Sequence, residues 1–132
     1  QVMVQAAALA KLLAAKERFG ALLTLHVHMA RAALAEERTD AAATAARAAL
    51  RLFDEGYAPE SMYRPEAHLV AWRALTQAGE HREAAAALSA GVDWIRRCAL
   101  PQVPAPFLDS FLHRNSVNRE MLAAATAANG HG

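Results

Sequence analysis

The stretch "QAGEHREAAAAL", residues Gln77–Leu88, decides which fold we expect. Gly79 predicts the end of one helix, because glycine is the residue that most often closes a helix. The alanines that follow Arg82 predict the next helix, since alanine has the highest helix propensity. An earlier stretch, "EERTDAAATAA" at residues 36–46, predicts an equivalent turn with Thr39 or Asp40 as the N-cap. The chain is therefore expected to contain helical hairpins.

Small residues recur at a fixed spacing inside the helical segments. Successive segments lie 34 and 42 positions apart, and the extra eight positions fall in "GYAPESMYRP", where glycine and proline mark a loop. Small side chains allow helix axes to approach closely. We therefore expect Ala42 and Ala84 to be buried where helices touch. The three segments are Ala8-x3-Leu12-x2-Ala15, Ala42-x3-Ala46-x2-Ala49 and Ala84-x3-Leu88-x2-Gly91.

The turn and the small residues together resemble the tetratricopeptide repeat, in which "G-[DE]-x-x-[ED]-A" joins helix A to helix B. The resemblance implies an all-α fold, a right-handed stack of antiparallel helical hairpins in one domain. An ordinary antiparallel helix bundle is the alternative. Gly20 is expected to turn the chain between the first two helices. The expected elements are an unpaired helix B at Gln1–Arg18, a repeat at 22–54 with helices 22–36 and 40–54, a repeat at 65–99 with helices 65–78 and 82–99, and a cap at 102–132.

The C-terminal segment is predicted to cap the stack. Three prolines between residues 101 and 106 exclude a continuous helix there. Pro106 can start a short helix with Phe107 and Phe111 on one face, and both side chains are expected to cover the last hairpin. Asn115 or Ser116 is expected to cap a final helix, which ends in "ANGHG" with a glycine stop and a frayed tail. The final helix is expected to contain the apolar residues Val117, Met121 and Leu122. The residues of the whole cap that are expected to face water are Asp109, Arg114, Asn118 and Arg119.

The same segment carries a second resemblance. Its pattern "F-x-D-S-F-L-x-R-N-x-x-N-R", residues 107–119, is similar to the end of helical-repeat regions in large bacterial regulators that contain an ATPase. The resemblance implies that this chain is part of a longer transcriptional or signalling regulator. The chain has no glycine-rich phosphate loop, so the ATPase would lie upstream of Gln1.

Composition excludes several classes of protein. The net charge is +1, which gives no basis for direct nucleic-acid binding. No apolar run is long enough for a membrane span, and the lone Cys98 allows no internal disulfide, so a bacterial cytoplasmic setting is expected. His26 and His28 point about 200° apart on a helix and cannot bind one metal together. We expect neither a metal, nor a cofactor, nor an enzyme.

One pair of residues predicts a binding site. Arg31 and Arg73 are 42 positions apart, the same offset as Ala42 and Ala84, so they occupy equivalent places on two A helices. Two guanidinium groups in one groove could bind a carboxylate or phosphate. Alternatively, each arginine pairs with a nearby acid such as Glu66 or Glu36. The other residues that the repeat resemblance places along this groove are Thr24, Val27, Leu34, Leu69, Thr76 and Gln77.

We therefore expect a non-enzymatic interaction and regulatory module. Its partner would be a protein, a peptide or upstream domains of the same chain, and the module could form homo-oligomers. The alternative is a sensor domain whose groove binds a small anionic effector. A closed pocket would favour the sensor, whereas an open groove with exposed apolar patches would favour protein binding.

Overall fold

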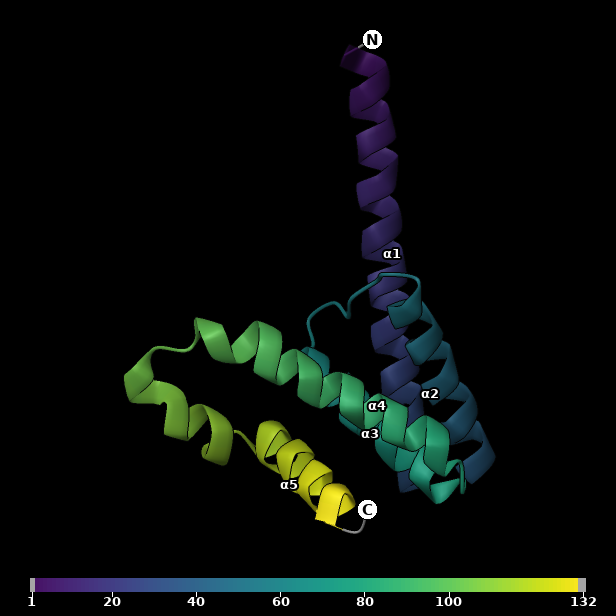
Figure 1. The fold of residues 1–132 in the computed structure, drawn as a ribbon. Coiled ribbons are helices and arrows are strands. Elements are labelled where there is room, and N and C mark those ends of the chain that lie inside the picture. The colour runs from purple at the N-terminus through teal and green to yellow at the C-terminus, as the bar shows by residue number, and fades with distance from the viewer. Residues whose placement is uncertain (1, 131–132) are drawn as a thin grey trace.

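The computed structural model describes residues 2–130, and all secondary structure in this range is helical (Figure 1). The predicted all-α class is therefore confirmed. Gln1 and the predicted frayed tail at residues 131–132 lie outside the described range. The elements are α1 (Val2–Ala35), α2 (Thr39–Asp54), α3 (Arg64–Gln77), α4 (His81–Trp94), the π-helical η1 (Ile95–Ala99), the short 3-10 helices η2 (Leu100–Gln102) and η3 (Ala105–Phe107), the π-helical η4 (Ser110–Arg114) and α5 (Ser116–Gly130).

Helices α1 and α3 end in the same hydrogen-bonded turn. At the end of α3, the Gly79 N–H donates to Thr76 O at 3.1 Å and the Glu80 N–H donates to Leu75 O at 2.9 Å. This is a Schellman motif, whose closing residue needs a left-handed backbone, and Gly79 has φ of +78°. The α1 turn has the same two bonds 42 positions earlier, with Glu37 at φ +58° in the place of glycine.

Gly20 does not turn the chain, and this prediction was wrong. Helix α1 runs through Gly20, because the neighbouring residues favour helix strongly enough to absorb the roughly 1 kcal/mol that one glycine costs. The glycine instead admits the loop between α2 and α3. A Cβ at this position would lie 2.8 Å from Ala58 O, and the Glu60 N–H donates to Gly20 O at 3.3 Å.

Alanine side chains form much of the contact between the first four helices. Helix α1 packs on α2 and α3, and α3 packs on α4. Ala42 and Ala84 are both buried in the cluster where these helices meet, which confirms their predicted burial. With methyl groups at the contacts, the helix axes can approach closely. The buried members of this cluster are Ala33, Ala42, Ala43, Ala46, Ala71, Ala74, Leu75, Ala84 and Ala87.

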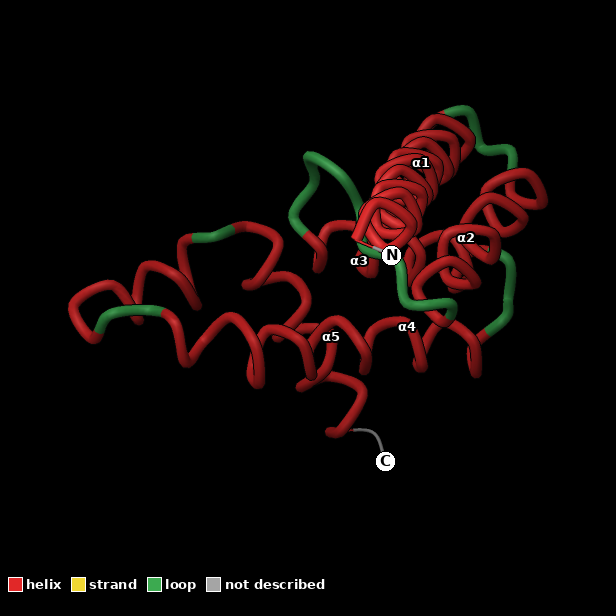
Figure 2. Tube along the Cα trace, turned by 90° about the horizontal axis from the view of Figure 1, so that it is seen from above, coloured by secondary structure: helices red, strands yellow, loops and turns green. Residues whose placement is uncertain are grey.

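Helix α5 lies along α4 and also contacts α3 (Figures 1 and 2). Met121 of α5 is fully buried among apolar side chains of α3 and α4. The helices approach closely at Gly91 of α4, where a Cβ would overlap Met121 Cε and lie 2.8 Å from His68 Cβ. Gly91 therefore allows three helices to meet at one point.

Phe107 does not cover the last hairpin, which contradicts its predicted capping role. Its side chain is 62% exposed, whereas Phe111 is half-buried against the α3–α4–α5 cluster. The reason is that the helical turns η1 and η2 follow directly on α4 and extend it beyond its hairpin with α3. Val103 and Pro104 are extended and separate η2 from η3, which carries Phe107 away from the hairpin. The chain reverses in this stretch (Figure 1).

Asn118 is fully buried and does not face water as predicted. Its side-chain N–H donates to Phe111 O at 3.0 Å, and its Oδ1 accepts from the Tyr63 hydroxyl at 2.7 Å. The predicted N-cap is confirmed at Asn115, whose Oδ1 accepts from the Asn118 N–H at 3.0 Å. These bonds fix α5 to η4 and to the start of α3.

Replacing Glu37 with glycine should stabilise the fold. A left-handed conformation costs an L-residue roughly 1–2 kcal/mol, and glycine avoids most of that cost. We expect Glu37→Gly to raise the free energy of unfolding by about 1 kcal/mol in urea denaturation. The neighbouring Glu36→Gly is the control and should not raise it, since Glu36 has no positive φ for glycine to relieve. A loss of stability in Glu37→Gly would contradict the turn geometry.

Candidate functional site

The structure places Arg31 and Arg73 at one cavity of about 200 Å³ between α1, α3 and α5. Each arginine has its own acidic partner. The Arg31 guanidinium donates to Glu66 Oε1 at 2.6 Å, and the Arg73 guanidinium is bound by both carboxylate oxygens of Glu120. This is the arrangement of the alternative in which each arginine pairs with a nearby acid.

These ion pairs join helices. Arg31–Glu66 connects α1 to α3, and Arg73–Glu120 connects α3 to α5. All four side chains are partly exposed, so each pair contributes at most about 1 kcal/mol. Each guanidinium is charge-compensated by its glutamate, so an added anion would bind beside a carboxylate and be repelled by it. Binding of an anionic effector at this groove stays a prediction.

The other predicted groove residues divide between the core and the surface. Thr24 holds the α2–α3 loop, because its hydroxyl accepts from the Glu60 N–H at 2.9 Å and lies 2.8 Å from Glu60 O. Val27 is buried in an apolar cluster between α1, α2 and α3, and Leu69 is buried in another between α3, α4 and α5. Leu34 is partly buried and packs against the first of these and against the alanine cluster. Thr76 and Gln77 are exposed. Only Leu69 also lines the arginine cavity.

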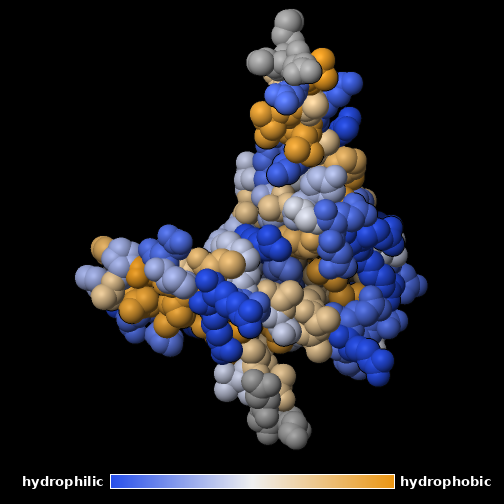
Figure 3. Space-filling model, turned by 45° about the horizontal axis from the view of Figure 1, so that its top comes forward, coloured by the Kyte–Doolittle hydropathy of each residue, from blue (hydrophilic) through white to orange (hydrophobic). Residues whose placement is uncertain are grey.

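The first half of α1 is a bare helix. Residues 4–14 are all exposed, and this half projects away from the other helices (Figure 1). Leu9, Leu12 and Leu13 are 56%, 54% and 51% exposed, and their spacing puts them on one side of the helix. Figure 3 shows the hydrophobic residues along the projecting part. We call Leu9, Leu12 and Leu13 the leucine face.

Local physics explains why this half is helical without a partner. Starting a helix is the unfavourable step, and the packed half of α1 has already provided that start. Residues 5–18 are alanine, leucine, lysine, glutamine, glutamate and arginine, which are the strongest helix formers. The helix therefore extends into solvent and carries its leucines with it.

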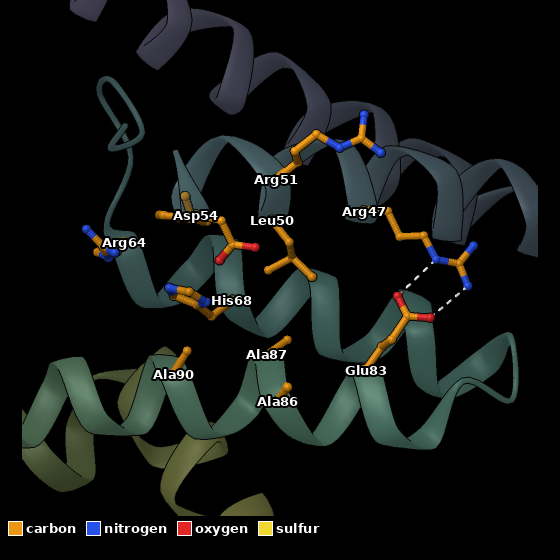
Figure 4. A pocket seen from close by; sticks show the side chains of 11 residues that line it. Arg47, Leu50, Arg51, Asp54, Arg64, His68, Glu83, Ala86, Ala87 and Ala90 are labelled. Carbon is orange, nitrogen blue, oxygen red and sulfur yellow. Dashed lines mark hydrogen bonds and ion pairs between the residues drawn. The ribbon is translucent and has the colours of Figure 1, made fainter. Parts of the chain in front are cut away.

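A larger cavity, of about 480 Å³, lies between α2, α3 and α4 (Figure 4). His68 of α3 lies at one end, stacked on Phe53 with ring centroids 4.4 Å apart. The Arg64 guanidinium lies 4.7 Å from the centroid of the same Phe53 ring. We call this space the histidine cavity. Its lining residues are Arg47, Leu50, Arg51, Phe53, Asp54, Arg64, His68, Glu83, Ala86, Ala87 and Ala90.

His68 is only 3% exposed, and neither ring nitrogen has a hydrogen-bond partner among residues 2–130. Burial, and to a lesser extent the charge of Arg64, lowers the pKa of His68 from 6.5 to about 4. The imidazole is therefore neutral at pH 7, with one N–H donor and one nitrogen acceptor. An unpartnered buried polar group costs about 1–3 kcal/mol.

Neither the leucine face nor the histidine cavity was predicted as a site. The unpaired helix at Gln1–Arg18 was the available indication of the leucine face, because a helix without a partner leaves its apolar side uncovered. The histidine cavity gave no such signal, because only Arg64 and His68 are related by helical spacing, whereas Arg51 belongs to α2 and meets them only through packing. Among residues 2–130 no group of histidine, cysteine and acidic side chains is arranged to hold a metal ion.

Comparison of this chain with known protein families, with curated proteins and with solved structures finds no match. No helix within residues 2–130 has the length and apolar character needed to cross a membrane. Function is therefore inferred from the geometry of the surfaces.

His68 should make the stability of the fold sensitive to acid. Between pH 6.5 and 4 the unfolded chain binds a proton at this residue that the folded chain excludes, so stability falls as pH falls through that window. We expect the wild type to lose about 2 kcal/mol more than His68→Leu between pH 7 and pH 5 in urea denaturation. Equal losses in the two proteins would contradict the buried, neutral state of His68. His81→Leu, at an exposed position, is the control.

Proposed function

We propose that this chain is a non-enzymatic interaction module with the tetratricopeptide-like stacking of helical hairpins. The leucine face is the observation that carries the proposal. Three leucines are about half exposed on one side of a projecting helix. Together they form one apolar surface, which is larger than the surface of a single exposed apolar residue. Such a surface is suited to bind another apolar surface.

Several features support the repeat part of the proposal. The turns at Glu37 and Gly79 share one hydrogen-bond pattern 42 positions apart. Contacts of α1 with α3, and of α5 with both α3 and α4, are those expected when each hairpin packs on the one before it. The resemblance of residues 107–119 to bacterial regulators supports a place in a signalling or transcriptional regulator.

The leucine face also indicates the chemistry of the partner. Alanines at positions 6, 8 and 10 accompany the leucines along the helix, so the backbone of a partner can come close. The partner is therefore a helix, or a pair of helices, with an apolar side. The single protein certain to carry such a helix is a second copy of this chain, which makes self-association the first measurement.

Replacing the leucine face should abolish association. We expect the purified chain to self-associate in analytical ultracentrifugation, and Leu9→Gln/Leu12→Gln/Leu13→Gln to weaken this association at least about a hundredfold. The reason is that each buried leucine contributes about 1.5 kcal/mol or more, and three are lost. Glutamine preserves helix propensity, so the helix itself should remain.

The matched control is Leu25→Gln/Met29→Gln. These side chains are 52% and 51% exposed, as much as the leucine face, but lie on the half of α1 that packs on α2 and α3. The control should associate as the wild type does. A wild type that stays monomeric, or a control that loses association to the same extent, would contradict the proposal.

A further inference from the structure

The charges of the histidine cavity are not balanced. Arg47 is compensated, because it donates to both oxygens of Glu83 at 3.0 and 3.1 Å and also lies 3.4 Å from Glu80. Arg51 and Arg64 make no ion pair among residues 2–130, and Asp54 is the one other acid in the lining. Outside the group formed by Arg47, Glu83 and Glu80, the unpaired Arg51 and Arg64 face Asp54 alone, which leaves 2 − 1 = +1 with His68 neutral.

The free polar atoms gather at one end of the cavity. The Nε of Arg64 is buried without a hydrogen-bond partner, as are both ring nitrogens of His68. Both side chains stack against Phe53, which fixes their positions. Figure 4 shows Arg64, His68 and Asp54 at this end, and the Arg47–Glu83 pair at the other. An incoming group that accepts hydrogen bonds and carries negative charge would satisfy the arginine and the imidazole N–H together.

The middle of the cavity is apolar. Leu50 of α2 faces Ala86, Ala87 and Ala90 of α4 across it (Figure 4). The small alanines leave open the volume that larger side chains would fill. A ligand here needs an apolar body as well as a charged group.

We propose that the histidine cavity binds a small organic monoanion, with its carboxylate at Arg64 and His68 and its apolar body between Leu50 and the alanines of α4. A single carboxylate matches the net charge of +1, whereas a doubly charged phosphate would bring excess negative charge beside Asp54. The apolar walls explain why an organic acid is favoured over an inorganic anion. This site is separate from the leucine face and goes beyond the interaction function.

Benzoate is the probe, since it joins one carboxylate to a flat apolar body. Titration of the purified chain should shift the NMR signals of the Ala86, Ala87 and Ala90 methyl groups and of the His68 ring. The methyl group of Ala32, exposed on α1, should not move. Benzamide has nearly the same shape without the charge and should bind at least tenfold more weakly. Equal binding of benzamide, or no shift of the alanine methyl groups at about 10 mM benzoate, would overturn the proposal.

One variant and its control test whether Arg64 binds the carboxylate of the ligand. Arg64→Gln should weaken benzoate binding at least tenfold while leaving benzamide binding unchanged, since it removes the cation and keeps a polar side chain. Arg38→Gln is the control, because Arg38 is exposed and pairs with Glu36 across 3.5 Å, away from the histidine cavity. Unchanged benzoate binding in Arg64→Gln, or an equal loss in Arg38→Gln, would overturn the assignment.

Discussion

Close approach of helices at small residues is the constraint on which this structure depends. Alanines form most of the contact between α1, α2, α3 and α4, and Gly91 lets α4 reach α3 and α5 at one point. A short side chain buries little apolar surface of its own, so stability must come from many such contacts at close range. Larger residues fill the spaces beside them, such as Leu75 and Met121, which are fully buried.

Both proposed sites follow from this way of packing. Where helices meet, alanine-rich faces are covered, and where α1 extends beyond its neighbours, its leucines are left bare. The approach of α3 to α4 at Gly91 also buries His68 beside Phe53, while the alanines of α4 keep the neighbouring space open. The same small residues therefore build the core and leave room for the histidine cavity.

The sequence predicted the local structure well because its signals are local. Starts and ends of α2, α3 and α4 follow from glycine, proline and alanine content, and the observed starts lie one residue from those predicted. The predicted N-cap of α2 was wrong, because Arg38 and not Thr39 or Asp40 holds that position, with no side-chain cap bond. The turn at Glu37 lacks the glycine of the turn at Gly79, yet it adopts the same geometry. Gly20 was misread because a glycine inside a helix and a glycine in a turn look alike in sequence, and only the distant Ala58 distinguishes them.

Long-range contacts account for the remaining errors. Asn118 looked like a surface residue until Tyr63, 55 positions away, supplied its partner. Phe107 looked like a cap because η1 and η2, the π-helical and 3-10 turns that carry the chain past the hairpin, have no sequence signature. The sequence predicted that Arg31 and Arg73 share a groove, and both line one cavity. It did not predict that Glu120 of α5 pairs with Arg73, because the two residues are 47 positions apart and belong to different helices.

Gly91→Ala tests the packing most directly, because two effects of opposite sign compete there. Helix propensity alone predicts that alanine stabilises α4 by about 1 kcal/mol. Close packing predicts the reverse, since the new Cβ would lie 2.8 Å from His68 Cβ and overlap Met121 Cε. We expect the free energy of unfolding, measured by urea denaturation, to fall by about 1–3 kcal/mol. A rise of about 1 kcal/mol would mean that α3, α4 and α5 do not meet at Gly91.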